Sequence, residues 1–118
     1  MTVYVKEGAD SVLAGLANMK AAMIEDYVGF MPPKDEVRKK MCEEYENNFT
    51  ITYGKKYIKI TEKGGGVKAF VVGVDNDKKI KKGDILKPAG WAAPARNAAR
   101  GNILDGGYPI NWTGPLYL

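Results

Sequence analysis

The 118-residue sequence predicts an α+β protein in which two N-terminal helices pack on one face of a four- to five-stranded antiparallel sheet. Two observations predict this class. Residues 12–47 place apolar side chains at helical spacing, and residues 49–74 alternate as strands do, with glycine-containing turns between them. The length suits a single domain, residues 1–118, of which 1–47 are mainly helical and 48–118 mainly strand.

Charge divides the chain at the same place. Residues 1–47 hold six Lys/Arg and nine Asp/Glu, a net charge of −3, whereas residues 48–118 hold twelve and five, a net charge of +7. A polyanion would therefore meet the basic, strand-rich half. The alternative is that these lysines keep a small sheet soluble and protect its edges.

The first elements follow from local patterns. Residues 2–6 alternate and predict a short strand that joins the sheet, and Asp10 or Ser11 is suited to cap a helix. One apolar stripe then recurs every three or four residues, which predicts a helix ending near Gly29 with its stripe in the core. The stripe consists of Val12, Leu16, Met19, Met23, Tyr27 and Phe30.

A second helix is predicted from the Pro32-Pro33 break to about Asn47. Its charged residues form several oppositely charged pairs four residues apart, so this helix lies on the surface. A narrow apolar seam formed by Val37, Met41 and Tyr45 is expected to bury one edge of it.

The remaining elements are strands. Residues 49–53 and 57–61 alternate across a short turn at Gly54 and predict a hairpin. Residues 67–74 form the most apolar run of this half and predict a central strand, with a short strand at 84–87. The aromatic and apolar tail, residues 108–118, is expected to pack as a terminal strand.

Residues 82–105 are the stretch that most suggests chemistry. Pro94 suits the first position of a short helix and Gly101 its stop, which would place Arg96 and Arg100 on one helix face. Trp91 is expected to anchor the preceding Pro/Gly corner to the core.

The two arginines, with Asn97 and Asn102, form a candidate anion-binding site. Guanidinium groups bind phosphate or carboxylate through bidentate, charge-assisted hydrogen bonds. The alternative is structural: Arg100 interacts with the helix C-terminus, and Arg96 pairs with one of two acids, Asp84 or Asp105.

Aromatic residues extend this site towards single-stranded nucleic acid. Bases stack on exposed rings while lysines contact the phosphates, and the candidate contact residues are Tyr53, Tyr57, Lys59 and Trp91. Nothing in the sequence resembles an element that enters the groove of a duplex.

Cofactor and metal chemistry is not expected. The chain has no histidine and a single cysteine, Cys42, so neither a conventional zinc site nor an internal disulfide is predicted. No apolar run is long enough for a membrane span and no secretory signal is recognised, so a cytoplasmic protein without membrane partners is expected.

One part of the chain resembles a known group. It is the run Lys-Gly-Asp-Ile-Leu-Lys-Pro-Ala-Gly-Trp-Ala-Ala-Pro-Ala-Arg-Asn-Ala-Ala-Arg-Gly-Asn-Ile-Leu-Asp-Gly together with the closing Trp-Thr-Gly-Pro-Leu-Tyr-Leu. These segments, within residues 82–118, resemble small uncharacterised proteins of tailed bacteriophages. The resemblance implies a viral accessory protein in the bacterial cytoplasm, and it implies no activity, cofactor or catalytic residue.

The leading functional hypothesis is a non-enzymatic binding module whose basic half meets nucleic acid or another polyanion. The alternative is a protein-interaction or structural module that forms a homo-oligomer, such as a homodimer. A small enzyme without an identifiable site is the third hypothesis.

Overall fold

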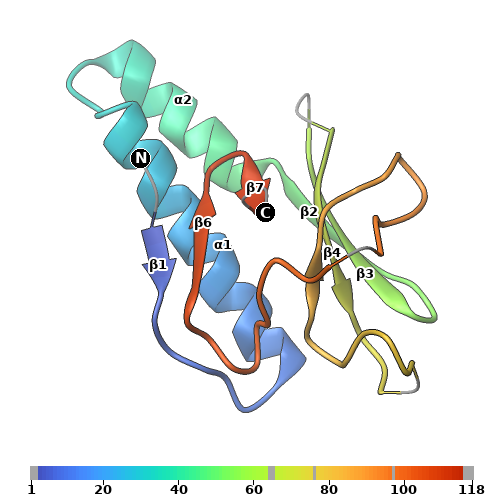
Figure 1. The fold of residues 1–118 in the computed structure, drawn as a ribbon. Coiled ribbons are helices and arrows are strands. Elements are labelled where there is room, and N and C mark those ends of the chain that lie inside the picture. Colours follow the sequence, from blue (N-terminus) through green and yellow to red (C-terminus); the bar gives the residue numbers. More distant parts are fainter. Residues whose placement is uncertain (1–2, 64–65, 76, 97, 116–118) are drawn as a thin grey trace.

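The computed structural model describes residues 3–63, 66–75, 77–96 and 98–115 (Figure 1). The two helices are α1 (Val12–Phe30) and α2 (Glu36–Asn47). The strands are β1 (Val3–Val5), β2 (Phe49–Tyr53), β3 (Tyr57–Glu62), β4 (Gly66–Val72), β5 (Ile85–Leu86), β6 (Tyr108–Asn111) and β7 (Gly114–Pro115). The α+β class and the antiparallel pairing are confirmed.

The strands form two sheets, where the sequence predicted one. The larger sheet has the order β2-β3-β4-β5 and the smaller one the order β1-β6-β7. The expectation that residues 2–6 join the main sheet was wrong, because β1 pairs with β6 instead, with Val3 opposite Ile110 and Val5 opposite Tyr108. Both strands turn buried apolar side chains to the same side, which explains this long-range pairing.

Helix α1 supplies the centre of the core. Ser11 caps it, because the Ser11 hydroxyl accepts a hydrogen bond from the Ala14 amide at 3.1 Å. Four residues of the stripe are buried, and all of them except Tyr27 share one apolar cluster with residues of both sheets. This cluster includes Leu16, Met19 and Met23 of α1, Ile58 and Ile60 of β3, Ala69 and Val71 of β4, and Tyr108 and Ile110 of β6.

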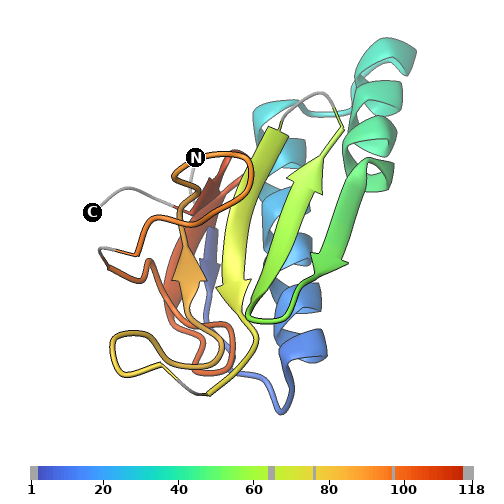
Figure 2. The same cartoon turned by 90° about the vertical axis from the view of Figure 1, so that its right-hand side faces the viewer.

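Both helices depart from the predicted burial pattern. In α1, Phe30 is 56% exposed, whereas Asp26, a polar position in the pattern, is 1% exposed. In α2, only Tyr45 of the predicted seam is buried, and Val37 is 70% exposed. Helix α2 thus meets the rest of the protein near its C-terminal end, and its other end projects away from the sheets (Figures 1 and 2).

The predicted short helix from Pro94 was wrong. The described residues between 92 and 101 hold no helical turn, and Pro94 forms an isolated bridge with Pro88. Two amides of this segment bond to carbonyls near β5: Ala95 to Lys87 and Arg100 to Ile85, both at 2.7 Å. Pairing with β5 satisfies backbone groups that a helix would have satisfied locally. Arg96 and Arg100 therefore do not share a helix face.

The turn between β6 and β7 is held by both helices at one residue, Trp112. Its amide donates to the Asp26 carboxylate of α1 at 2.8 Å, and its carbonyl accepts from the Tyr45 hydroxyl of α2 at 2.7 Å. The rings of Tyr27 and Tyr45 stack 4.2 Å apart, and the Trp112 ring meets both edge-on. The prediction that the tail packs thus holds as far as residue 115, and residues 116–118 lie outside the described part.

Replacing Tyr45 by phenylalanine tests this attachment. Tyr45→Phe should lower the free energy of unfolding by about 1–2 kcal/mol, because the Trp112 carbonyl loses its donor in a partly buried position. Urea denaturation measures the change. Tyr53→Phe is the control, since the Tyr53 ring is 60% exposed. Equal losses in the two variants would contradict the assigned role of the hydroxyl.

Candidate functional site

The outer face of the larger sheet carries two of the four predicted nucleic-acid contact residues, Tyr57 and Lys59. Side chains alternate along a strand, so the burial of Ile58 and Ile60 turns Tyr57 and Lys59 to the opposite face. Across the ladder, Lys59 lies opposite Thr52 of β2 and Phe70 of β4. The strands that close the core therefore also display a row of polar and aromatic side chains outwards.

Part of this outer face is covered by a second, smaller apolar cluster. The cluster contains Phe70, Val72, Ile80 and Leu86, with Tyr57, Val67 and Ala99 packed against it. Its later members come from the chain after β4, which lies along the β4 side of the sheet (Figure 2). The cluster thus covers β4 and β5 and extends to Tyr57 on β3.

A surface groove of about 240 Å³ lies beside this cluster. We call it the lysine groove, and its lining residues are Thr52, Gly54, Lys55, Lys56, Tyr57, Lys59, Phe70 and Ala92. Three of these described lining residues are lysines and none is acidic. The Lys56 ammonium also lies 5.6 Å from the centre of the Tyr57 ring. The groove therefore combines positive charge with aromatic surface.

Trp91 stands at the rim of the lysine groove. The expectation that it anchors its loop to the core was wrong, since Trp91 is 67% exposed. Its ring instead holds the Lys59 ammonium 4.0 Å from the ring centre, a cation–π contact. The loop preceding it, from Pro88 to Gly90, forms a shallow hollow with Val67 and Trp91. An exposed indole is thus fixed next to a lysine.

Tyr53, the fourth predicted contact residue, lies elsewhere. It sits opposite Ile58, whose side chain is in the core, so Tyr53 is on the inner side of the sheet at the exposed end of β2. The structure thus brings together Tyr57, Lys59 and Trp91 and separates them from Tyr53. Lys55 and Lys56 were not predicted from the sequence as contact residues. Their position in the turn between two alternating strands is the signal that could have identified them.

Asp77 is the counter-charge beside the lysine groove. Its carboxylate pairs with Lys56 and Arg96 and accepts hydrogen bonds from the amides of Lys79 and Ile80. The hydrogen bond from Lys56, then that from the Lys79 amide, holds the pKa of Asp77 well below its usual range. Arg96 therefore pairs with Asp77 and not with either carboxylate that the sequence suggested.

The other members of the predicted anion site have separate partners. Arg100 is half-buried and donates from Nη1 to the Ala98 carbonyl at 3.0 Å. Burial and the nearby Arg100 guanidinium lower the pKa of Lys87, so these two cations are neighbours.

Asn102 is 6% exposed and donates to the Asp84 carboxylate at 2.9 Å and to the Lys82 carbonyl at 3.0 Å. Its amide oxygen accepts from the amides of Leu104 and Asp105. Asn102 thus organises a loop, and Asn97 lies outside the described residues. Anion binding by these four residues stays a prediction.

Other site types receive no support in the described part of the chain. It contains no group of three or more His, Cys, Asp or Glu residues placed to hold a metal ion. Neither described helix has the length and apolar character needed to cross a bilayer.

Acid titration tests the Asp77 ion pairs. Because the pKa of this carboxyl is lowered in the folded state, its stabilisation is complete above the unfolded value of about 4 and is lost as the pH falls below it. The difference in urea midpoint between the natural chain and Asp77→Asn should be largest at about pH 6 and shrink towards about pH 2. Asp75→Asn, at an exposed aspartate, is the matched control. A difference that does not change with pH would contradict the assignment.

Comparison with known proteins identifies a family. No curated protein and no solved structure matches the chain. A family described as a family of unknown function, DUF7717, matches residues 5–117, which span both helices, both sheets and the lysine groove. The chain belongs to the DUF7717 family.

Proposed function

We propose that this protein is a non-enzymatic module that binds single-stranded nucleic acid in the lysine groove. The observation that carries the proposal is the groove itself, with three lysines and Tyr57 in its lining, no acidic residue among the described lining residues, and an exposed Trp91 at its rim. Positive grooves flanked by aromatic rings bind single strands by combining phosphate contacts with base stacking.

The geometry supports a division of labour between these side chains. Lys55 is exposed, so its ammonium is available to a phosphate without breaking an ion pair that the structure describes. Lys59 lies next to the Trp91 ring, so a phosphate held by Lys59 would bring its base within reach of the indole. In a duplex the base faces are stacked inside, which is why the exposed indole favours a single strand over a double helix.

The alternative, that these lysines only keep the sheet soluble and protect its edges, does not account for this arrangement. Lysines that only protect an edge are scattered among acids and point into water, whereas those of the lysine groove converge on one hollow beside two aromatic rings. The excess of seven positive charges over residues 48–118 would also attract a polyanion to this half.

Replacing lysines tests the electrostatic part of the proposal. Lys55→Gln/Lys59→Gln should weaken binding of a labelled oligothymidylate and reduce the slope of log affinity against log salt by about 0.7 for each lysine lost. Fluorescence anisotropy at several salt concentrations measures the slope. The matched control is Lys39→Gln/Lys40→Gln, which removes the same charge from α2. Equal slopes in the two double variants would refute the groove as the binding site.

Replacing Trp91 tests whether the ligand has bases. Trp91→Ala should weaken oligothymidylate binding by about 1–3 kcal/mol, the usual range for the loss of one stacked base. Binding of inorganic polyphosphate, which has no bases, should change little. Tyr4→Ala is the control at a residue 58% exposed. A matching loss for both polyanions would show that the site recognises charge alone and would contradict a nucleic-acid ligand.

A further inference from the structure

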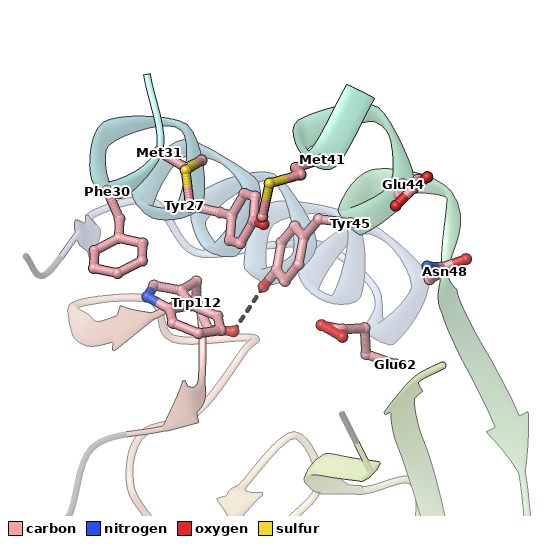
Figure 3. Close-up of a pocket in the computed structure, with 9 residues that line it drawn as sticks. All are labelled: Tyr27, Phe30, Met31, Met41, Glu44, Tyr45, Asn48, Glu62 and Trp112. Carbon is pink, nitrogen blue, oxygen red and sulfur yellow. Dashed lines mark hydrogen bonds between the residues drawn. The ribbon is translucent and has the colours of Figure 1, made fainter. Parts of the chain in front are cut away.

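A second hollow, which shares no lining residue with the lysine groove, has the opposite character. This aromatic pocket, of about 310 Å³, lies where the end of α1, the end of α2 and the turn between β6 and β7 meet (Figure 3). Its lining residues are Tyr27, Phe30, Met31, Met41, Glu44, Tyr45, Asn48, Glu62 and Trp112. The proposed nucleic-acid site uses none of them.

Aromatic rings form much of the lining. The planes of Tyr27 and Tyr45 are parallel to within 2°, and the Trp112 ring is nearly perpendicular to both, at 78° and 79°. Phe30 lies against Trp112 with ring centres 5.4 Å apart and is itself 56% exposed. The negative face of a ring attracts a cation, and because Tyr27 and Tyr45 cover one face of each other, each offers a ligand only its outer face.

The charges of the pocket have one sign. Glu44 and Glu62 are both in the lining, and no described lining residue is a lysine or an arginine. Burial raises the pKa of Tyr45, and the next largest contribution is the negative charge of Glu62. Burial also raises the pKa of Tyr27, with smaller contributions that include both glutamates. The two phenols thus respond to a negative potential in this region.

The chain already places one ammonium group next to the pocket. Lys68 is 7% exposed, and its Nζ lies 3.8 Å from the Glu62 carboxylate and 5.7 Å from the centre of the Trp112 ring. A buried ammonium is costly unless such partners compensate it, so the surroundings of Trp112 and Glu62 stabilise a cation. Lys68 partly neutralises Glu62, which leaves the exposed Glu44 as the charge available to a ligand.

We propose that the aromatic pocket binds a small alkylammonium ligand of about the size of choline. The aromatic rings would contact the alkyl groups around the nitrogen, and Glu44, with a partial contribution from Glu62, would supply the opposite charge. The volume is at the lower end of the range for small-molecule sites, which favours a compact ligand over an extended one.

Trp112 provides a direct signal for testing this. The chain has two tryptophans, so Trp91→Phe leaves Trp112 as the only indole. In that background, choline should change the tryptophan emission saturably. The neutral isostere 3,3-dimethylbutan-1-ol, which has the same shape without the charge, should bind at least about 5-fold more weakly. An equal response to the two probes, or no saturable response to choline, would overturn the proposal.

Two variants locate the site. Glu44→Gln should weaken choline binding by about 2- to 5-fold, whereas Glu43→Gln, the neighbouring glutamate outside the lining, should not. Phe30→Leu should weaken binding by a similar factor without unfolding the protein, because the Phe30 ring is largely exposed. Far-ultraviolet circular dichroism confirms that each variant is folded. Unchanged affinity in both Glu44→Gln and Phe30→Leu would overturn the assignment to this pocket.

Discussion

The rest of the structure depends on the attachment of the backbone of one residue, Trp112, to two helices through its amide and its carbonyl. Asp26 accepts the amide hydrogen and Tyr45 donates to the carbonyl, so α1 and α2 hold opposite sides of the same turn. Asp26 is 1% exposed, and a carboxylate so buried is costly without a donor. The helix pair and the smaller sheet therefore stabilise each other. Both the position of β6 in the core and the shape of the aromatic pocket follow from this attachment.

Side chains alternate along the strands of the larger sheet, so each strand contributes both to the core and to the outer surface. One face of β3 places Ile58 and Ile60 in the main core, and the other places Tyr57 and Lys59 at the lysine groove. The second apolar cluster covers the outer face over β4 and β5 and extends to Tyr57 on β3, so the groove forms along its border. The proposed binding surface is thereby supported by strands, although one of its residues, Trp91, comes from a loop.

The features that the sequence predicts well, the two helices and the β2–β3 hairpin, are determined by residues that are close together in the chain. The ranges of the two helices follow from capping by Ser11 and from the Pro32-Pro33 break, and the hairpin follows from alternation around Gly54. Capping and periodicity act over a few residues and can be read directly from the chain. Of the predicted contact residues, Tyr57 and Lys59 share one face of β3 and Trp91 contacts Lys59, whereas Tyr53 lies on the other face.

The errors concern partners distant in sequence. Pro94 has a suitable helix-start pattern, but the segment after it donates hydrogen bonds to the carbonyls of Lys87 and Ile85 in place of helical ones. The sequence pattern places Asp26 on the surface. In the fold it is buried, because the amide of Trp112, far along the chain, donates a hydrogen bond to it. No local pattern distinguishes such cases, because the favourable contact exists only in the assembled fold.

The pairing of β1 with β6 also determines when the protein can finish folding. Val3 pairs with Ile110, so the smaller sheet joins segments from nearly opposite ends of the sequence. During synthesis, the helices and the β2–β3 hairpin have their partners early, whereas β1 cannot pair until β6, far along the chain, has left the ribosome. Closing so long a loop is entropically costly and slow. We therefore expect the smaller sheet to form last. Until then, the part of the apolar surface of α1 that packs against β6 stays exposed to solvent.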